Sequence, residues 1–333
     1  MAEPLADSPA PAPPPPPAAP PAPAPARPSL FGAVMLRLEA VAFVAAALLS
    51  ILFYLRLPST LPSEADYRAA AQEIAAAAKD GDAVLLDPHW AERARLFVQN
   101  VPVLNLHRHP VRDDLRGYGH LFVLSLPDLP RSNQGATFEL LDSFKFKQAG
   151  APKRFGELTV TQFDNTRLER PSFDFVSEVA RAKVYFRRGD GSEELCPERN
   201  GRHPCPRAGW INVGVEVKEI DSKPLRCLWA HPAHNDPLVI EYAGTVLGKS
   251  LDVVGGIVGQ IVYRVEKYGT VKLAVKIDGK LQAEIDFPPG KPGEKRRSID
   301  TAALAGTPHL VQFEVSADNP DMRHFCFAAG AYP

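Results

Sequence analysis

The segment from Leu38 to Leu55 constrains this chain more than any other part of it. It reads LEAVAFVAAALLSILFYL, and Glu39 is its only charged residue. As an α-helix, its 18 residues would extend roughly 27 Å, close to the hydrocarbon thickness of a bilayer. About 37 residues precede it and no small-residue cleavage pattern follows, unlike a secretory signal peptide. We therefore predict an uncleaved membrane anchor; the alternatives are a signal peptide and a buried core helix.

Charge is balanced along the chain. Its 333 residues include 38 Lys and Arg and 39 Asp and Glu, which gives a formal net charge of -1. A nucleic-acid-binding protein normally has an excess of basic side chains on one face, so we expect no nucleic-acid partner. About 270 residues follow the hydrophobic segment, enough for two domains of ordinary size.

Composition and periodicity predict four parts of the chain. Residues 1–29 contain 13 of the 34 prolines, with alanine as the commonest other residue, which predicts a disordered Pro/Ala-rich tail. Residues 30–57 would form the transmembrane anchor. Residues 63–150 are expected to form a small α/β Rossmann-like domain, and residues 151–333 a β-sandwich domain.

Helices and strands alternate in the predicted α/β domain. Ser63 followed by Asp66 is typical of a helix N-terminus, and an alanine-rich helix would run to Lys79. A buried strand is expected at 83–87, a second helix at 90–99, and further strands at 101–106 and 121–126. Strand, helix and strand within about 25 residues form a βαβ unit, which predicts a Rossmann-like layer.

From Phe155 onward the hydrophobic period changes to two. Alternating strands are expected to begin at 158–163 and to continue at 213–217, 271–277, 281–287, 310–315 and 324–328. Asp278-Gly279 is a strong two-residue hairpin turn. Many short strands with frequent turns predict an antiparallel β-sandwich, jelly-roll-like in type.

The four cysteines form two plausible pairs. Cys196 and Cys205 bracket the eight-residue loop PERNGRHP, while Cys227 and Cys326 lie near the two ends of the last sheet pattern. Disulfides form in oxidising compartments, so these pairs favour a location outside the cytoplasm.

One candidate site follows the first strand of the α/β domain. Asp87 and His89 would lie at its carboxyl end, where such sheets bind ligands; the alternative is that Asp87 caps a helix. The turn Asp87-Pro88-His89-Trp90 has no glycine, which argues against a nucleotide. A weaker zinc hypothesis involves His107, His109 and His120, with Asp113 and Asp114 as carboxylates. We predict no metal and no cofactor.

A second candidate site lies in the sandwich. The sequence WAHPAHND contains Trp229, His231 and His234, and Tyr242 follows it. Together with Trp210, Tyr263 and Tyr268, these rings would stack on a sugar if one sheet face exposed them; the alternative is that they are core residues. Neither a Gly-x-Ser-x-Gly elbow nor a His-Glu-x-x-His motif occurs in the sequence, so whether the protein is an enzyme stays open, with a preference for a non-catalytic role.

Several stretches together resemble a known family. The sequences YRAAAQEIAAAAKDGDAVLLDPHWAERARLFV and GHLFVLSLPD are similar to the extracytoplasmic Rossmann-like part associated with polyprenyl-phosphate-sugar-dependent glycosyltransferases of bacterial envelopes. LRCLWAHP, VKLAVKIDG and HLVQFEVSADNPDMRHFCFAAGAY resemble a jelly-roll, carbohydrate-binding-like sandwich fused to such proteins. Those transferases have many membrane helices, whereas this chain has one such segment. The resemblance therefore implies the fold and a link to glycans, but not transferase activity.

These observations give one first hypothesis and two alternatives. The first is a non-catalytic protein held in the bacterial inner membrane by Leu38 to Leu55, with most of the chain in the periplasm, where it binds a glycan or a neighbouring envelope protein. The second is an accessory subunit of an envelope glycosyltransferase. The third is a hydrolase that acts in the cleft between the two domains, using Asp87, His89 or the histidines near His107.

Overall fold

A computed structural model of the chain describes residues 30–57, 61–105, 110–126, 134–221, 223–234, 236–259 and 268–333, with side chains from Leu38 onward. The chain forms two compact units, Met1–Leu61 and Pro62–Pro333. Each unit is described by itself. The Pro-rich tail, His107, His109 and Tyr263 lie outside the described residues.

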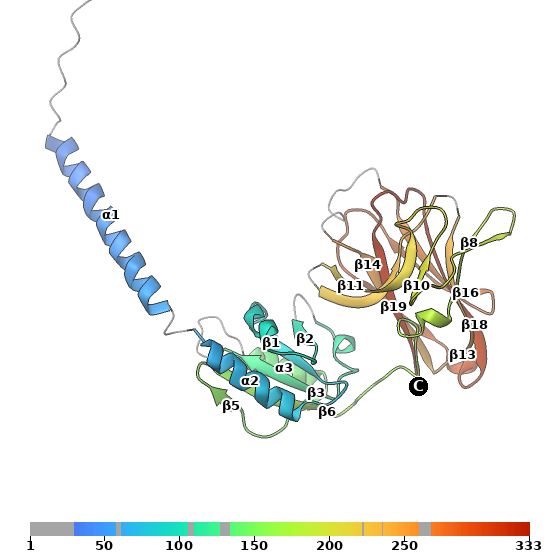
Figure 1. Cartoon of the computed structure of the whole chain (residues 1–333), viewed down its shortest axis with the longest axis horizontal. Coiled ribbons are helices and arrows are strands. Elements are labelled where there is room, and N and C mark those ends of the chain that lie inside the picture. Colours follow the sequence, from blue (N-terminus) through green and yellow to red (C-terminus); the bar gives the residue numbers. More distant parts are fainter. Residues whose placement is uncertain are drawn as a thin grey trace, which may run out of the picture. The chain divides into compact units, whose positions relative to one another are not determined.

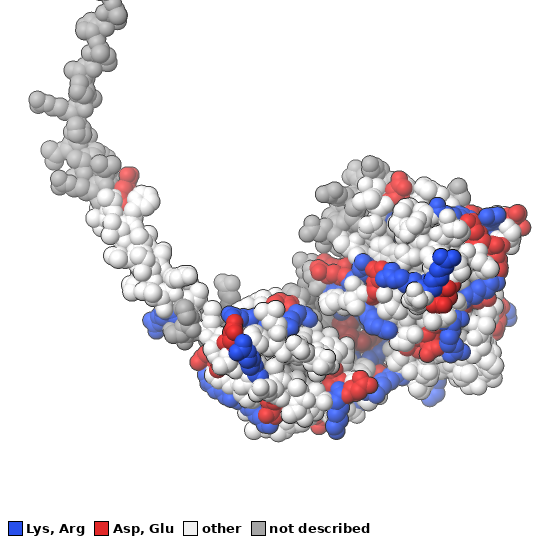
Figure 2. Space-filling view, in the orientation of Figure 1, with Lys and Arg blue, Asp and Glu red and all other residues white. Residues whose placement is uncertain are grey.

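The first unit contains one long helix, α1 (Leu30–Arg56). Its apolar stretch Leu38–Arg56 is long enough to cross a membrane, and none of it is buried inside the protein. Figure 2 shows that its surface carries almost no charged side chains. A core helix would be buried, so that alternative is wrong. A membrane anchor and a signal segment both fit a helix of this kind.

The second unit begins with α2 (Glu64–Ala77), and its predicted N-terminus is confirmed. The Ser63 side chain accepts a hydrogen bond from the Asp66 backbone N–H, and the Asp66 carboxylate accepts one from the Ser63 N–H. This reciprocal cap satisfies two backbone donors that would otherwise lack partners.

A mixed sheet follows α2, with strand order β2-β1-β3-β6-β4 and β5 paired beside β6. Strand β1 is parallel to β2 and β3, while β6 is antiparallel to its neighbours. Helix α2 packs on one face of the sheet, and α3 (Gln134–Ser143) packs on the other (Figure 1). The strands are β1 (Ala83–Asp87), β2 (Val103–Asn105), β3 (His120–Ser125), β4 (Phe146–Gln148), β5 (Lys153–Phe155) and β6 (Leu158–Asn165). We call residues 62–165 the α/β layer.

Two predictions for this layer are wrong. The helix expected at 90–99 is only a short 3₁₀ segment, Glu92–Leu96. The sequence predicts that the strand at 158–163 belongs to the sandwich, but it forms β6, which pairs with β3 in the α/β layer. Its side chains are buried on both faces of this sheet, with Val160 packed on one side and Phe163 on the other. The boundary predicted after residue 150 therefore falls inside the first sheet.

Two further sheets form a predominantly antiparallel β-sandwich, as predicted. The first has the order β10-β11-β12-β19-β14-β17, with β7 beside β19, and the second has the order β16-β15-β18-β13-β8-β9. Their inner faces share one hydrophobic core, in which Phe313 of β18 and Phe327 of β19 lie 5.2 Å apart between ring centroids. The predicted Asp278-Gly279 hairpin turn joins β15 to β16, and both residues have positive φ, as a type I′ turn requires.

The bounds of the sandwich strands are as follows: β7 (Phe173–Asp174), β8 (Lys183–Arg187), β9 (Glu193–Leu195), β10 (Arg202–Pro204), β11 (Asn212–Ile220), β12 (Lys223–Ala230), β13 (Leu238–Val246), β14 (Ser250–Ile257), β15 (Val271–Ile277), β16 (Lys280–Phe287), β17 (Lys295–Asp300), β18 (Pro308–Ala317) and β19 (Phe325–Tyr332). Short 3₁₀ segments occur at Arg112–Asp114, Val179–Arg181 and Ala302–Leu304.

Both predicted disulfides are present in the sandwich. Cys196 pairs with Cys205, with Cα atoms 4.4 Å apart, and Cys227 pairs with Cys326, with Cα atoms 5.8 Å apart. No cysteine is free. Two disulfides in one domain are typical of proteins that fold in an oxidising compartment.

Candidate functional site

Four rings from three parts of the sandwich meet at one place, which we call the aromatic cluster: Trp210, Trp229, His231 and His324. Trp229 lies on β12, and His231 directly follows this strand. Strand β19 pairs with β12 so that Cys326 lies opposite Trp229. This register brings His324, just before β19, beside the end of β12. Trp210 comes from the loop between β10 and β11.

His231 contacts each of the other three rings of the aromatic cluster. The Trp210 and His231 centroids are 4.6 Å apart with the ring planes at 77°. His324 lies 5.4 Å from Trp229 and 5.6 Å from His231 between centroids. Trp210 is 59% exposed, and Trp229 and His324 are half-buried, whereas His231 is only 3% exposed. Three rings therefore reach solvent, and the buried His231 ring packs against them on the protein side.

Polar side chains of β10 and β11 border these rings. The Lys218 ammonium nitrogen lies 4.9 Å from the Trp229 ring centroid and 2.6 Å from a Glu216 carboxylate oxygen. Arg202 bonds the same Glu216 at 3.0 Å and the Asn212 side chain at 3.2 Å. Exposed rings beside fixed donors and acceptors suit a ligand that has both apolar faces and hydroxyl groups.

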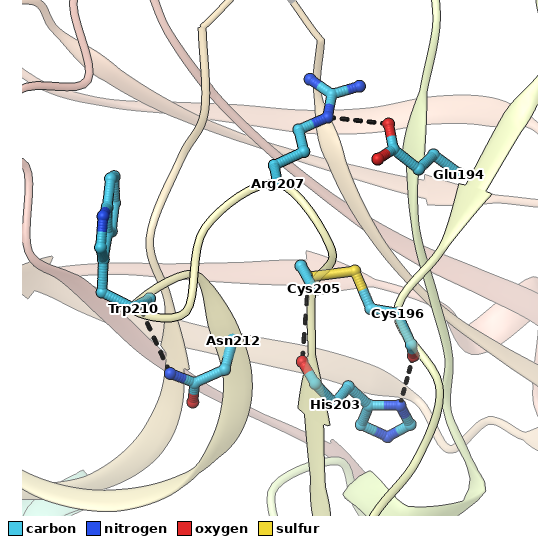
Figure 3. Close-up of a disulfide and its surroundings, with 7 residues drawn as sticks. All are labelled: Glu194, Cys196, His203, Cys205, Arg207, Trp210 and Asn212. Atoms are coloured by element: carbon cyan, nitrogen blue, oxygen red, sulfur yellow. Dashed lines mark hydrogen bonds and ion pairs between the residues drawn. A yellow bond between two sulfur atoms is a disulfide. The ribbon is translucent and has the colours of Figure 1, made fainter.

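The loop that carries Trp210 is tied down at several points (Figure 3). It starts at Cys205, which is held to Cys196 by the first disulfide. Arg207 in the loop bonds Glu194 of β9 at 2.9 Å. It also bonds Asp236 at 2.6 Å. The backbone N–H of Cys205 donates to the Ile211 carbonyl at 3.0 Å, which closes the loop. The exposed Trp210 side chain therefore belongs to a loop that these contacts hold in place.

Burial sets the charge of the two histidines in the aromatic cluster. Desolvation lowers the pKa of His231 to about 4, and desolvation together with the nearby Lys218 lowers the pKa of His324. The Nδ1 of His231 lies 2.7 Å from the Pro232 carbonyl oxygen, which only accepts, so Nδ1 carries the proton. At neutral pH the His231 ring is therefore uncharged, with Nε2 as an acceptor.

The structure separates the six residues predicted to bind a ligand. Trp229 and His231 belong to the aromatic cluster. His234 is exposed and lies 3.7 Å from the Asp321 carboxylate. Tyr242 is a core residue instead: it is 1% exposed, and its hydroxyl donates to the Phe175 carbonyl at 2.7 Å, so it has no surface to offer a ligand. Asp87 and His89 lie in the α/β layer, at a different cavity.

Sequence reasoning missed several residues of this surface, among them His324 and Lys218. His324 is distant from Trp229 along the chain, and only the β12–β19 pairing brings them together. Lys218 lies on β11 between the exposed residues Val217 and Glu219, and it looks like any solvated lysine on a strand. Neither position has a local signal in the sequence.

A cavity of about 350 Å³ lies between the α/β layer and the sandwich. Ion pairs fill its lining: Asp114 contacts Lys223 at 2.5 Å and also bonds Arg296, while Arg116 bonds Asp252 at 2.6 Å. Neither Asp87 nor His89 lines this cleft, so the two do not act there as the hydrolase hypothesis requires.

Of the histidines in the zinc hypothesis, only His120 lies among the described residues, and it belongs to no group that could hold a metal ion there. His120 bonds the buried Asp82 carboxylate instead, with Nδ1 2.9 Å from Oδ1. In residues 30–57, 61–105, 110–126, 134–221, 223–234, 236–259 and 268–333, no group of three His, Cys, Asp or Glu side chains is placed to hold a metal ion.

No protein-family model matches the chain, and no curated protein matches it. The solved structures to which it is similar include carbohydrate-binding modules of Clostridium perfringens. The CBM51-2 and INT domains of ZmpB are 15% identical with a TM-score of 0.25, and the alignment covers 45% of this chain and 26% of that one. CBM51-2 and INT in complex with GlcNAc are 14% identical with a TM-score of 0.30, covering 53% and 44%.

A third similar structure is CBM51 from C. perfringens GH95 in complex with methyl-galactose. It is 12% identical with a TM-score of 0.27, and the alignment covers 41% of this chain and 93% of that one. The chain spans about a quarter of the first of the three structures and less than half of the second. At these TM-scores the likeness assigns no role to any residue, so the function is argued from the side chains of this chain alone.

Proposed function

We propose that this protein is a non-catalytic glycan-binding protein that α1 anchors in the bacterial inner membrane, with its sandwich in the periplasm. The aromatic cluster carries this proposal. Trp210 and Trp229 supply flat apolar faces that stack on sugar rings, and Lys218, Asn212 and Arg202 supply donors for sugar hydroxyls.

Charge favours a neutral ligand on this surface. His231 and His324 are uncharged at neutral pH, and the side chains of Lys218 and Arg202 are paired with Glu216. Figure 2 shows acidic and basic side chains interspersed over the visible face of residues 62–333. A partner recognised by net charge is therefore not expected, whereas a polyhydroxylated ligand fits.

Two features support the membrane location. The apolar stretch of α1 is long enough to cross a bilayer, and two disulfides suit an oxidising compartment. The parallel strands β2-β1-β3 support the Rossmann-like layer predicted from the sequence. The role as an accessory subunit of an envelope glycosyltransferase stays a prediction, because no contact in the described residues speaks for it.

A glycan array tests the proposal. The full-length chain is applied in a detergent without a sugar headgroup, since sugar detergents would compete for the surface. We expect binding to at least one glycan class, and we expect Trp210→Ala and Trp229→Ala each to weaken it about tenfold or more. Leu281→Ala, which removes an exposed apolar side chain from the other sheet, is the matched control and should bind normally. The proposal would be refuted if no glycan bound, or if both tryptophan variants bound as tightly as the parent chain.

A further inference from the structure

The α/β layer contains a buried carboxylate that the aromatic cluster does not use. Asp87, the last residue of β1, is 7% exposed. Its Oδ2 is buried and has no hydrogen-bond partner among the residues that the structure describes. A buried acceptor without a donor is costly, and folded proteins rarely retain one without a reason.

This carboxylate faces a cavity of about 340 Å³, which we call the Asp87 cavity. Its lining combines apolar and polar groups: Leu85, Leu86, Asp87, Pro88, His89, Trp90 and Thr137. Trp90 is 54% exposed and offers a flat apolar wall. Thr137, a residue of α3, brings a hydroxyl to the same cavity.

The strand order gives a second, independent reason to place a ligand here. Strand β1 has β2 on one side and β3 on the other, and all three are parallel. The strand that follows β1 in the sequence, β2, lies on one side of it, and the next strand, β3, lies on the other side. The strand order therefore reverses direction at β1. In open α/β sheets, ligands bind outside the carboxyl ends of the strands at such a reversal. Asp87 occupies that position.

We propose that the Asp87 cavity binds an uncharged sugar ring, separately from the aromatic cluster. A sugar hydroxyl donates to Asp87 Oδ2, the Thr137 hydroxyl bonds a neighbouring hydroxyl, and the C–H face of the sugar stacks on Trp90. Among the described residues of the lining there is one carboxylate, too few by itself for a divalent cation, which takes several oxygen ligands.

The environment of the carboxylate agrees with this assignment. Desolvation raises the pKa of Asp87, and hydrogen bonding from Thr137 and the charge of His89 offset this only in part. A hydroxyl that donates to Oδ2 would replace the lost hydration of the carboxylate. A neutral ring achieves this without bringing a second charge into the cavity.

The three tryptophans of the chain make the test specific. In the full-length variant Trp210→Phe/Trp229→Phe, Trp90 is the only indole, so its fluorescence reports on the Asp87 cavity alone. This variant is titrated with glucose, galactose, mannose and N-acetylglucosamine. We expect a saturable change in Trp90 emission with at least one of them. The reciprocal variant Trp90→Phe reports on the aromatic cluster, so failure of one site is distinguished from failure of the other.

Substitutions in the Trp90-only background identify the residues responsible. Asp87→Asn keeps the shape of the side chain and should weaken binding about tenfold or more. Thr137→Val should also weaken it, and it serves if Asp87→Asn does not fold, as judged by circular dichroism. Asp80→Ala removes an exposed carboxylate from the same layer and should change nothing.

Three results would overturn the inference. The first is that none of the four sugars gives a saturable change in Trp90 emission. The second is that Asp87→Asn and Thr137→Val, once folded, bind as tightly as the parent. The third is a response to glucosamine without one to N-acetylglucosamine, which would identify an ammonium site instead of a neutral-sugar site.

Discussion

Trp210 and His231 meet edge to face, with centroids 4.6 Å apart and planes at 77°. Trp210 is among the more exposed large side chains of the sandwich, and His231 is almost fully buried. The buried imidazole thus supports the exposed indole. Its charge state therefore matters for stability and for the shape of the surface.

Stability should depend on pH through His231. Its folded pKa is about 4, and an unfolded histidine titrates near 6.5. Between these values the unfolded chain binds more protons, so the free energy of unfolding should fall as the pH falls from about 6.5 to about 4, by up to about 3 kcal/mol. Above about pH 6.5 this contribution is complete. Urea unfolding near pH 7 and near pH 4.5 measures it.

The control for this pH effect is His231→Phe, which keeps a buried ring but cannot be protonated. Its free energy of unfolding should decrease less between the two pH values than that of the parent. His324, whose pKa is also lowered, contributes to both proteins alike. Equal decreases in the parent and the variant would contradict the role assigned to His231.

The two disulfides should contribute differently. Cys227 and Cys326 are 99 residues apart, and the chain-entropy model assigns such a loop about 4 to 5 kcal/mol. Cys196 and Cys205 are only 9 residues apart, which corresponds to less than about 3 kcal/mol. Replacing both cysteines of a pair by alanine and measuring urea unfolding compares them. A larger loss for the short pair would contradict this ranking.

The Cys196–Cys205 disulfide should contribute more to glycan binding than the Cys227–Cys326 disulfide does. It holds the loop that carries Trp210, whereas Cys227 and Cys326 join two strands that are already paired. Cys196→Ala/Cys205→Ala should therefore weaken glycan binding several-fold under conditions where the variant is folded. A calorimetric titration with the glycan found on the array measures this, and unchanged affinity would argue against bracing by the disulfide.

Tyr242→Phe tests the assignment of Tyr242 to the core. The variant loses one buried hydrogen bond, from the Tyr242 hydroxyl to the Phe175 carbonyl, and should be destabilised by about 1 to 2 kcal/mol. Its glycan affinity should equal that of the parent, since the ring stays in the core. A loss of binding without a loss of stability would instead return Tyr242 to the ligand surface.

The anchor proposal predicts how the chain fractionates. The full-length protein should stay with membranes after an alkaline carbonate wash, which removes proteins held only by charge. Deletion of residues 30–56 should release it into the soluble fraction. A soluble full-length protein, or a shorter mature chain that begins after Arg56, would show instead that α1 is not a permanent anchor.

Local sequence signals predicted the local structure well. The Ser63–Asp66 cap, the buried strand β1, the Asp278-Gly279 hairpin and the alternating strands depend on neighbouring residues, and all are present. The helix predicted at 90–99 failed because its apolar spacing does not separate a full helix from a short 3₁₀ segment. Strand β6 was assigned to the wrong sheet, because a period of two does not say which strand is the partner.

The sequence by itself determined that the chain has one membrane-length helix, an α/β part, a sandwich and two cysteine pairs, since hydrophobic period and residue spacing are local properties. Only the tertiary structure decided which rings meet. Trp229 and Tyr242 look alike in the sequence, yet one lies at the surface and the other in the core, because sheet pairing fixes which face each strand presents. The same pairing brings His324 to Trp229, and the β2-β1-β3 order leaves the Asp87 carboxylate facing a cavity.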